Sequence, residues 1–132
     1  MNLLLWGLQI LLALIFLLHG SVLVIEPASM QKELVEGFSI FSKGFQQFIG
    51  VAELLASLGL ILPGLTKIAT WLTPLAALGL IPIMIGAAWV HMAHREMPKA
   101  IGCAVIMLLI ILVGWLRWQV FPLVDPQQYQ IT

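Results

Sequence analysis

Four long apolar stretches constrain this chain more than any other feature of its sequence. They cover about residues 3–25, 44–62, 67–92 and 99–118. The hydrocarbon core of a bilayer is about 30 Å thick, and a helix that rises about 1.5 Å per residue crosses it in about 20 residues. Each stretch has about this length. We therefore expect an all-α, integral membrane four-helix bundle that forms a single membrane domain over residues 1–132.

The composition supports this class and excludes others. Hydrophobic residues make up 61% of the chain and charged residues only 9%, whereas ordinary soluble domains are about 25% charged. Lys plus Arg equals Asp plus Glu at six each, so no basic excess indicates nucleic-acid binding. The single cysteine, Cys103, excludes an internal disulfide and a CxxC redox pair. Any redox chemistry would therefore need a cofactor or another subunit.

The segment between the first two stretches has a different pattern. Large apolar residues recur there at steps of three or four, which is the period of one helical face: Met30, Leu34, Phe38, Phe41, Phe45 and Phe48. This pattern predicts an amphipathic interfacial helix over about residues 28–43. A long, kinked extension of the second span is the alternative. The C-terminal tail, residues 119–132, is expected to be extended.

The basic residues suggest how the spans are oriented. An even number of spans places both termini on one side of the membrane, together with Lys67 and Arg117. Four other basic residues then lie on the opposite side: Lys32, Lys43, Arg95 and Lys99. The positive-inside rule favours the cytoplasm for the side with more of them. We expect a multi-pass protein of a cell membrane, with the bacterial inner membrane as the predicted compartment.

Counting residues along antiparallel spans places several polar side chains in one half of the bundle. His19 lies six residues before the end of the first span, about 9 Å in, and Glu53 lies about 13 Å into the second. His91 and His94 close the third span on the same side. An ionised carboxylate at this depth costs several kcal/mol, so Glu53 should face the interior, be protonated, or pair with His19 or His91.

These four residues, His19, Glu53, His91 and His94, form the predicted ligand-binding cluster. A packing role, in which Glu53 only fixes helix registry, is the alternative. The i, i+3 spacing of His91 and His94 would also suit a metal with Glu96 or Glu53. Two histidines at an interface are too few to indicate a metal, and none is expected. The opposite half of the bundle offers mainly threonines, and we expect it to be nearly inert.

Small residues recur through the second and third spans, where they allow close approach of helix backbones. Here four sequence runs carry a resemblance to a known family: FIGVAELL at residues 48–55, LGLILPG at 58–64, LTPLAALGL at 72–80 and MIGAA at 84–88. Together with His91, they resemble the signature of the DoxX and DoxX-like membrane proteins. The match covers about a third of the chain and agrees with the four-span layout.

The resemblance implies a set of functions. Some proteins of this family are small subunits of membrane oxidoreductases, including thiosulfate to quinone enzymes and a complex tied to oxidative-stress defence. Others look like assembly factors. Only Glu53, Pro74 and His91 of the singled-out residues match the family pattern; His19 and His94 come from the depth argument alone.

Two classes of function follow as expectations. The first is a quinone-associated subunit of a membrane oxidoreductase, in which Glu53 and a histidine bind a quinone and pass protons; a flavin or thiol domain would belong to a redox partner subunit. The second is a non-enzymatic scaffold or assembly factor for a membrane-protein client, or a lipid-binding protein. Whether the chain is itself an enzyme, and whether it forms a homo-oligomer, stays open.

Overall fold

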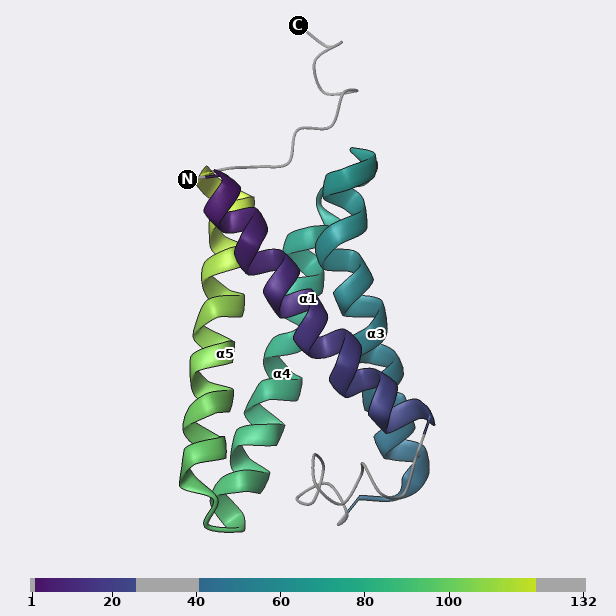
Figure 1. The fold of residues 1–132 in the computed structure, drawn as a ribbon, viewed down its shortest axis with the longest axis vertical. Coiled ribbons are helices and arrows are strands. Elements are labelled where there is room, and N and C mark those ends of the chain that lie inside the picture. The colour runs from purple at the N-terminus through teal and green to yellow at the C-terminus, as the bar shows by residue number, and fades with distance from the viewer. Residues whose placement is uncertain (1, 26–40, 121–132) are drawn as a thin grey trace, which may run out of the picture.

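A computed structural model describes residues 2–25 and 41–120 of the chain. Within these residues it contains four long helices and no strand (Figure 1). The helices are α1 (Asn2–Ile25), α3 (Lys43–Thr66), α4 (Leu72–Ala93) and α5 (Met97–Trp115), and the π-helical turn η2 (Leu116–Val120) continues α5. All four are long and apolar enough to cross a membrane. The predicted all-α, four-span architecture is confirmed.

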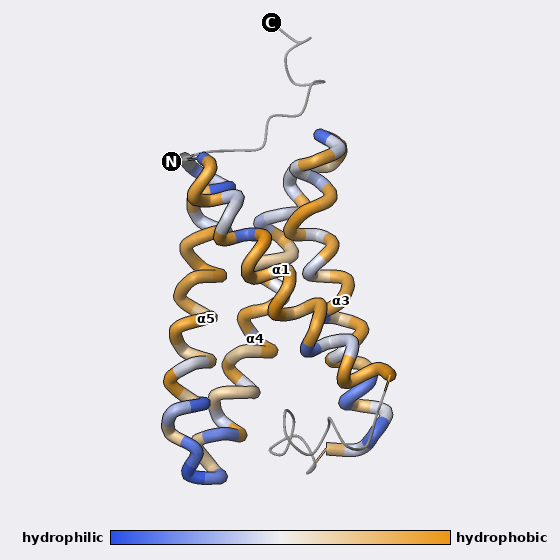
Figure 2. The backbone as a smooth tube through the Cα atoms, in the orientation of Figure 1, coloured by the Kyte–Doolittle hydropathy of each residue, from blue (hydrophilic) through white to orange (hydrophobic). Residues whose placement is uncertain are grey.

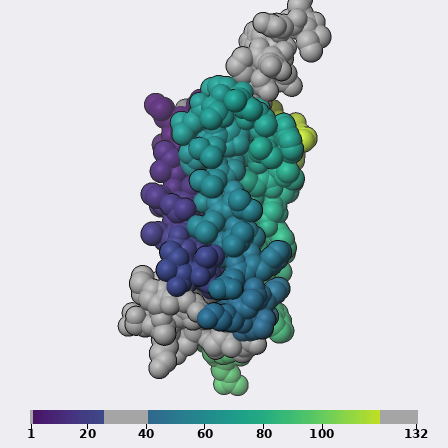
Figure 3. All heavy atoms as spheres, turned by 90° about the vertical axis from the view of Figure 1, so that its right-hand side faces the viewer, coloured from purple at the N-terminus to yellow at the C-terminus, as the bar shows by residue number. Residues whose placement is uncertain are grey.

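The helices run alternately up and down, and α1 crosses the others diagonally (Figure 1). Its first turns lie beside η2 and the end of α5, whereas its last turns lie beside the start of α3. Accordingly, α1 packs mainly on α3, and α4 packs mainly on α5. Contacts between α3 and α4 connect these two pairs. Seen from the side, α3 lies in front with α1 and α4 on either side of it (Figure 3). Hydrophilic residues concentrate at the ends of the helices (Figure 2).

Small residues set the closest contacts between helices, as the sequence predicts. Gly20 of α1 faces Gly50 of α3 so closely that a Cβ on Gly20 would lie 2.7 Å from the Gly50 carbonyl oxygen. A Cβ on Gly59 of α3 would lie 2.9 Å from the Cβ of Ala76 on α4. The backbones approach because no side chain separates them, which is the usual device for packing helices in membranes.

The end of the second span corrects a prediction. The dipeptide Pro63-Gly64 is expected to stop the helix near Leu62, but α3 continues to Thr66. Pro63 has no N–H to bond the Gly59 carbonyl one turn earlier, but membrane helices tolerate internal prolines where neighbours satisfy the freed group. In the last turn of α3, the Thr66 hydroxyl donates a hydrogen bond of 2.8 Å to the Leu62 carbonyl. The helix ends instead at Lys67, which has a left-handed backbone with φ of 59°.

The third and fourth spans also begin at other residues than predicted. α4 starts at Leu72 rather than near Lys67, because Lys67 and Ala69 both have positive φ and form a turn. α5 starts at Met97 rather than Lys99, with Pro98 in its first turn. Proline is harmless there because the first N–H groups of a helix have no partner within it.

The predicted interfacial helix, residues 28–43, lies almost entirely outside the described residues, as does most of the tail, residues 119–132. Its last residues are described and correct the prediction: Phe41 and Ser42 are not helical, and Lys43 opens α3. Ser42 is the N-cap of α3, and its hydroxyl accepts a hydrogen bond from the Phe45 N–H. Phe45 and Phe48 therefore belong to the second span itself.

Candidate functional site

Glu53 is fully buried in the bundle, with 0% of its surface exposed. Its Oε2 lies 2.7 Å from Nδ1 of His19, so the carboxyl group of α3 and the imidazole of α1 share a hydrogen bond. The other carboxyl oxygen, Oε1, is buried and has no hydrogen-bond partner among the described residues. The structure therefore brings together the two residues that depth counting predicts to share a layer.

The contact between Gly20 and Gly50 explains why this pair forms. Glu53 follows Gly50 by three residues, which places it on the same face of α3. A Cβ on Gly20 would lie 3.1 Å from the Cβ of Glu53, so α1 covers the carboxylate directly. His19 precedes Gly20 and reaches Glu53 from the same crossing. The pair avoids the cost of an isolated charge in the membrane by holding a proton between its two groups.

His19 lines a cleft of about 270 Å³ between α1, α4 and α5. The lining residues are Ile15, Phe16, His19, Met84, Ala87, His91, Lys99, Gly102, Cys103 and Ile106. Most of them are apolar, and the polar groups are two imidazoles, one amine and one thiol. Glu53 does not line this cleft and lies behind His19. The arrangement suits a largely apolar molecule with a small number of hydrogen-bonding atoms.

His91 reaches the cleft from the last turn of α4, next to the turn that leads into α5. Its Nδ1 lies 2.7 Å from Oε2 of Glu96, and the Lys99 Nζ donates to Oε1 of Glu96 at the same distance. Lys99, and then His91, hold the pKa of the Glu96 carboxyl below its ordinary value of 4.5. The prediction offered His91 as a partner of Glu53, but the structure gives Glu96 to His91 and His19 to Glu53.

His94 is set apart from the other predicted site residues. Its Nδ1 lies 2.9 Å from the Val90 carbonyl one turn back on α4, and its side chain does not line the cleft. The rings of His91 and His94 therefore take separate partners. No cluster of three or more His, Cys, Asp or Glu side chains suited to a metal occurs within residues 2–25 and 41–120.

A second polar cluster lies in the half of the bundle that the sequence analysis expects to be inert, and that expectation is wrong. Arg117 of η2 is only 3% exposed. Its Nε donates to Oε1 of Gln9 at 2.5 Å, and its Nη1 donates to Oδ1 of Asn2 at 2.8 Å. The Gln9 Nε2 donates to the Leu60 carbonyl at 2.7 Å. The guanidinium also lies over the Trp6 ring, 5.4 Å from its centroid.

This cluster connects α1, α3 and η2 through one amide side chain. The same residue count that pairs His19 with Glu53 would have found it, because Gln9, Leu60 and Arg117 lie at similar distances from the other end of the bundle. The available signal was a polar residue within an apolar run at position 9. From the sequence, Arg117 contributes only to the count of basic residues that orients the spans.

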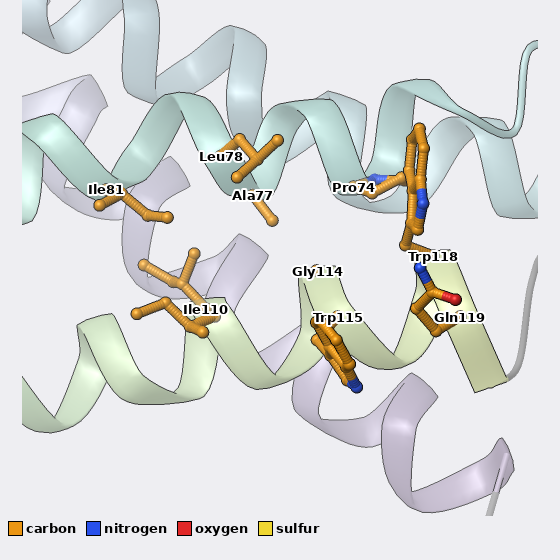
Figure 4. Close-up of a pocket in the computed structure, with 10 residues that line it drawn as sticks. Pro74, Ala77, Leu78, Ile81, Ile110, Gly114, Trp115, Trp118 and Gln119 are labelled. Atoms are coloured by element: carbon orange, nitrogen blue, oxygen red, sulfur yellow. The ribbon is translucent and has the colours of Figure 1, made fainter.

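A second hollow is an apolar groove of about 300 Å³ between α4 and the end of α5 (Figure 4). Pro74 and Trp118 lie at one end, and Ile81 and Ile110 at the other. None of the described residues that line it has a titratable side chain. Although this groove exceeds the His19 cleft in volume, of the two it is the cleft that combines apolar walls with groups that can bond or move a proton.

Four apolar spanning helices around a buried carboxyl–imidazole pair define a multi-pass helical membrane protein. The model of the DoxX-like family matches residues 7–114, which is most of the chain. The protein belongs to the DoxX-like family, as the resemblance predicts. No curated protein and no solved structure matches the chain.

Proposed function

We propose that this DoxX-like protein is a quinone-associated subunit of an oxidoreductase complex in the bacterial inner membrane. The quinone head binds in the His19 cleft. The observation that carries the proposal is the fully buried Glu53 bonded to His19 at the wall of an apolar cleft. Such a pair is costly to bury and is typical of sites that bind or move protons within a membrane.

A quinone head fits the chemistry of the cleft. The head is a flat apolar ring with carbonyl oxygens that accept hydrogen bonds, and the cleft offers apolar walls with the imidazoles of His19 and His91. Its volume of about 270 Å³ lies just below the range for ligand pockets, about 300–1,000 Å³. This size suits a ring with its tail in the lipid rather than a whole lipid molecule.

The charges near the cleft favour a neutral ligand over an anion. His19 faces the Glu53 carboxyl group, and Glu96 bonds both His91 and Lys99. Each basic side chain that lines the cleft therefore already has an acidic neighbour. A carboxylate or phosphate ligand would have to compete with these acids, whereas a quinone carbonyl needs only a donor.

The residues then have separate roles. His19 donates to a quinone oxygen and supplies a proton as that oxygen becomes a hydroxyl. Glu53 is a positioning residue, because it acts through His19 by fixing the imidazole ring and holding charge behind it. The two electrons come from a reduced flavin or a thiol pair in a partner subunit.

The test is the affinity of purified protein in nanodiscs for a short-chain benzoquinone. His19→Ala should weaken binding several-fold, since a hydrogen bond contributes about 0.5–1.5 kcal/mol, and Glu53→Gln should weaken it less. His94→Ala is the matched control, because His94 lies outside the cleft. Wild-type protein that neither retains nor binds a quinone would overturn the proposal.

A non-enzymatic scaffold or assembly factor is the second candidate. The observation that favours it is the exposure of α5, of which only 17% is buried against 39% for α1 and α3. Such a face contacts either lipid or another membrane protein. Under this alternative, crosslinking in native membranes recovers one stable partner, and deletion of the protein lowers the abundance of that partner while quinone binding is absent.

A further inference from the structure

The cluster at the turn between α4 and α5 reaches from the molecular surface into the cleft. The side chain of Lys99 is 47% exposed, that of Glu96 26% and that of His91 12%. Glu96 bonds both of the others at 2.7 Å, while His91 and Lys99 also line the cleft. A continuous set of polar groups therefore joins the outer end of the bundle to the cleft wall.

We infer that His91 carries protons from the membrane surface into the cleft, with Glu96 as the surface group that feeds it. This inference rests on the proposed function, because the protons are those that a quinone consumes. Reduction of a quinone to a quinol takes two electrons, here from the partner's reduced flavin or thiol pair, and two protons. Without a route from water, the pair formed by the buried Glu53 and the half-buried His19 would give up its proton once and would not regain it.

The hydrogen bonds of His91 suit this role. Its Nδ1 is held by Glu96, which fixes the ring. Its Nε2 makes no hydrogen bond with any residue in the described part of the chain, so that nitrogen can exchange a proton with a molecule in the cleft. An imidazole accepts a proton on one nitrogen and releases one from the other, which is the chemistry of a shuttle.

The other titratable groups near His91 suit the role less well. Lys99 also touches Glu96 and the cleft, but an ammonium group holds its proton firmly at neutral pH. His94 bonds the Val90 carbonyl and Arg95 lies on the turn outside both helices. On the facing helices, Cys103 and His19 line the cleft, and Glu53 lies behind His19. Among these, only His91 joins a surface carboxylate to the cleft through a group that exchanges protons readily.

The experiment measures proton uptake when the methyl viologen radical cation, whose one-electron oxidation releases no proton, reduces a bound short-chain benzoquinone in nanodiscs, followed with a pH-sensitive dye after mixing. His91→Ala should slow this uptake at least about tenfold, within the range of general acid–base catalysis, while quinone affinity changes far less. Free imidazole in the buffer should restore the rate, because it replaces the missing ring. His94→Ala is the control and should take up protons at the wild-type rate.

Each outcome decides the matter. A wild-type rate in His91→Ala would overturn the inference, and so would a slow rate that imidazole does not restore, since the side chain would then be only structural. His91→Gln keeps a polar side chain of similar reach without a titratable group, so it should bind quinone and remain slow even if the alanine variant is unstable. If wild-type protein binds no quinone, the proposed function fails first, and the affinity measurement shows this separately.

Discussion

Glu53 combines two properties that are expensive together in a membrane, because it is ionisable and no part of it is exposed. One carboxyl oxygen bonds His19 and the other has no partner in the described residues. An unsatisfied buried acceptor costs about 1–3 kcal/mol. A packing residue would avoid this cost, since leucine would fill the same space without a polar atom.

The ion pairs of Glu96 with Lys99 and His91 can be tested by their pH dependence. Lys99 and His91 lower its pKa from the ordinary value of 4.5, so the folded state holds its proton less tightly than the unfolded state. The stability that this carboxylate contributes is present above that ordinary value and is lost as the pH falls through the lowered one. The difference in thermal midpoint between wild type and Glu96→Gln should therefore be present at neutral pH and shrink below pH 4.5. A difference that stays constant would contradict the ion-pair geometry.

The bond between Gln9 and Arg117 predicts coupled effects on stability. Gln9→Leu removes the acceptor for the buried Arg117 Nε and the donor for the Leu60 carbonyl. This change should lower the free energy of unfolding by about 1–3 kcal/mol. In a double-mutant cycle with Arg117→Met, the double variant should lose less than the sum of the single losses. Additive losses would show that the two side chains do not depend on each other.

The depth of each residue within its span was sufficient to predict that His19 and Glu53 meet. The same count would have been sufficient to predict that Gln9 and Arg117 meet. His19 and Glu53 were found because charged or titratable residues inside a span attract attention. Gln9 carries no charge, and Arg117 lies so near a span end that it reads as an interfacial anchor. The choice of Glu96 as the partner of His91 was not predictable, because it depends on the backbone of the turn, where Arg95 has a φ of 60°.

Among the helices, the crossing of α1 and α3 controls the geometry of the site. Gly50→Ala should be destabilising by about 1–3 kcal/mol, because the new Cβ would lie 2.8 Å from both the Gly20 carbonyl oxygen and the Leu23 Cβ. Gly86→Ala on α4 is the control, since a Cβ there meets nothing within 4 Å. That control should be neutral or slightly stabilising, because alanine favours a helix over glycine. Thermal unfolding in detergent compares them, and equal midpoints would contradict the close crossing.

Helix existence was predictable, whereas helix ends were not. Each apolar stretch is long enough to span a bilayer, and that alone fixes four helices. Their ends depend on local backbone conformation, such as the left-handed residue Lys67 at which α3 ends, beyond Pro63. The predicted end of the interfacial helix at residue 43 was wrong, because Phe41 and Ser42 are not helical and Lys43 already opens α3.

At the scale of the whole molecule, the diagonal course of α1 creates the cleft. Gln9 and Asn2 hold one end of α1 to η2, while Gly20 and His19 hold the other end to α3. The distance between α1 and α5 therefore increases along α1 (Figure 1). The cleft lies where these two helices diverge, and α4 forms its third wall. Hydropathy gives no information about this tilt, which is why the cleft itself could not be predicted.

Filling the cleft provides a test that does not depend on polar groups. Gly102 lines it, and a Cβ at this position meets nothing within 4 Å. Gly102→Leu should therefore fold normally and lose quinone affinity by tenfold or more, because the side chain occupies the ligand's space. Gly79→Leu adds the same side chain at an equally open glycine outside the cleft. Equal affinity in both variants would place the ligand elsewhere, with the apolar groove of Figure 4 as the next site to examine.

The proposed function requires that a quinone occupies the cleft beside His19. The accessibility of Cys103 shows directly whether this cleft is occupied. This residue is the single cysteine of the chain, it is partly buried, and it lines the cleft. The measurement is the rate at which a membrane-permeant maleimide alkylates Cys103 in nanodiscs, with and without a saturating short-chain benzoquinone. The quinone should slow alkylation several-fold in wild-type protein and much less in His19→Ala. An alkylation rate that the quinone leaves unchanged in wild-type protein would contradict the account.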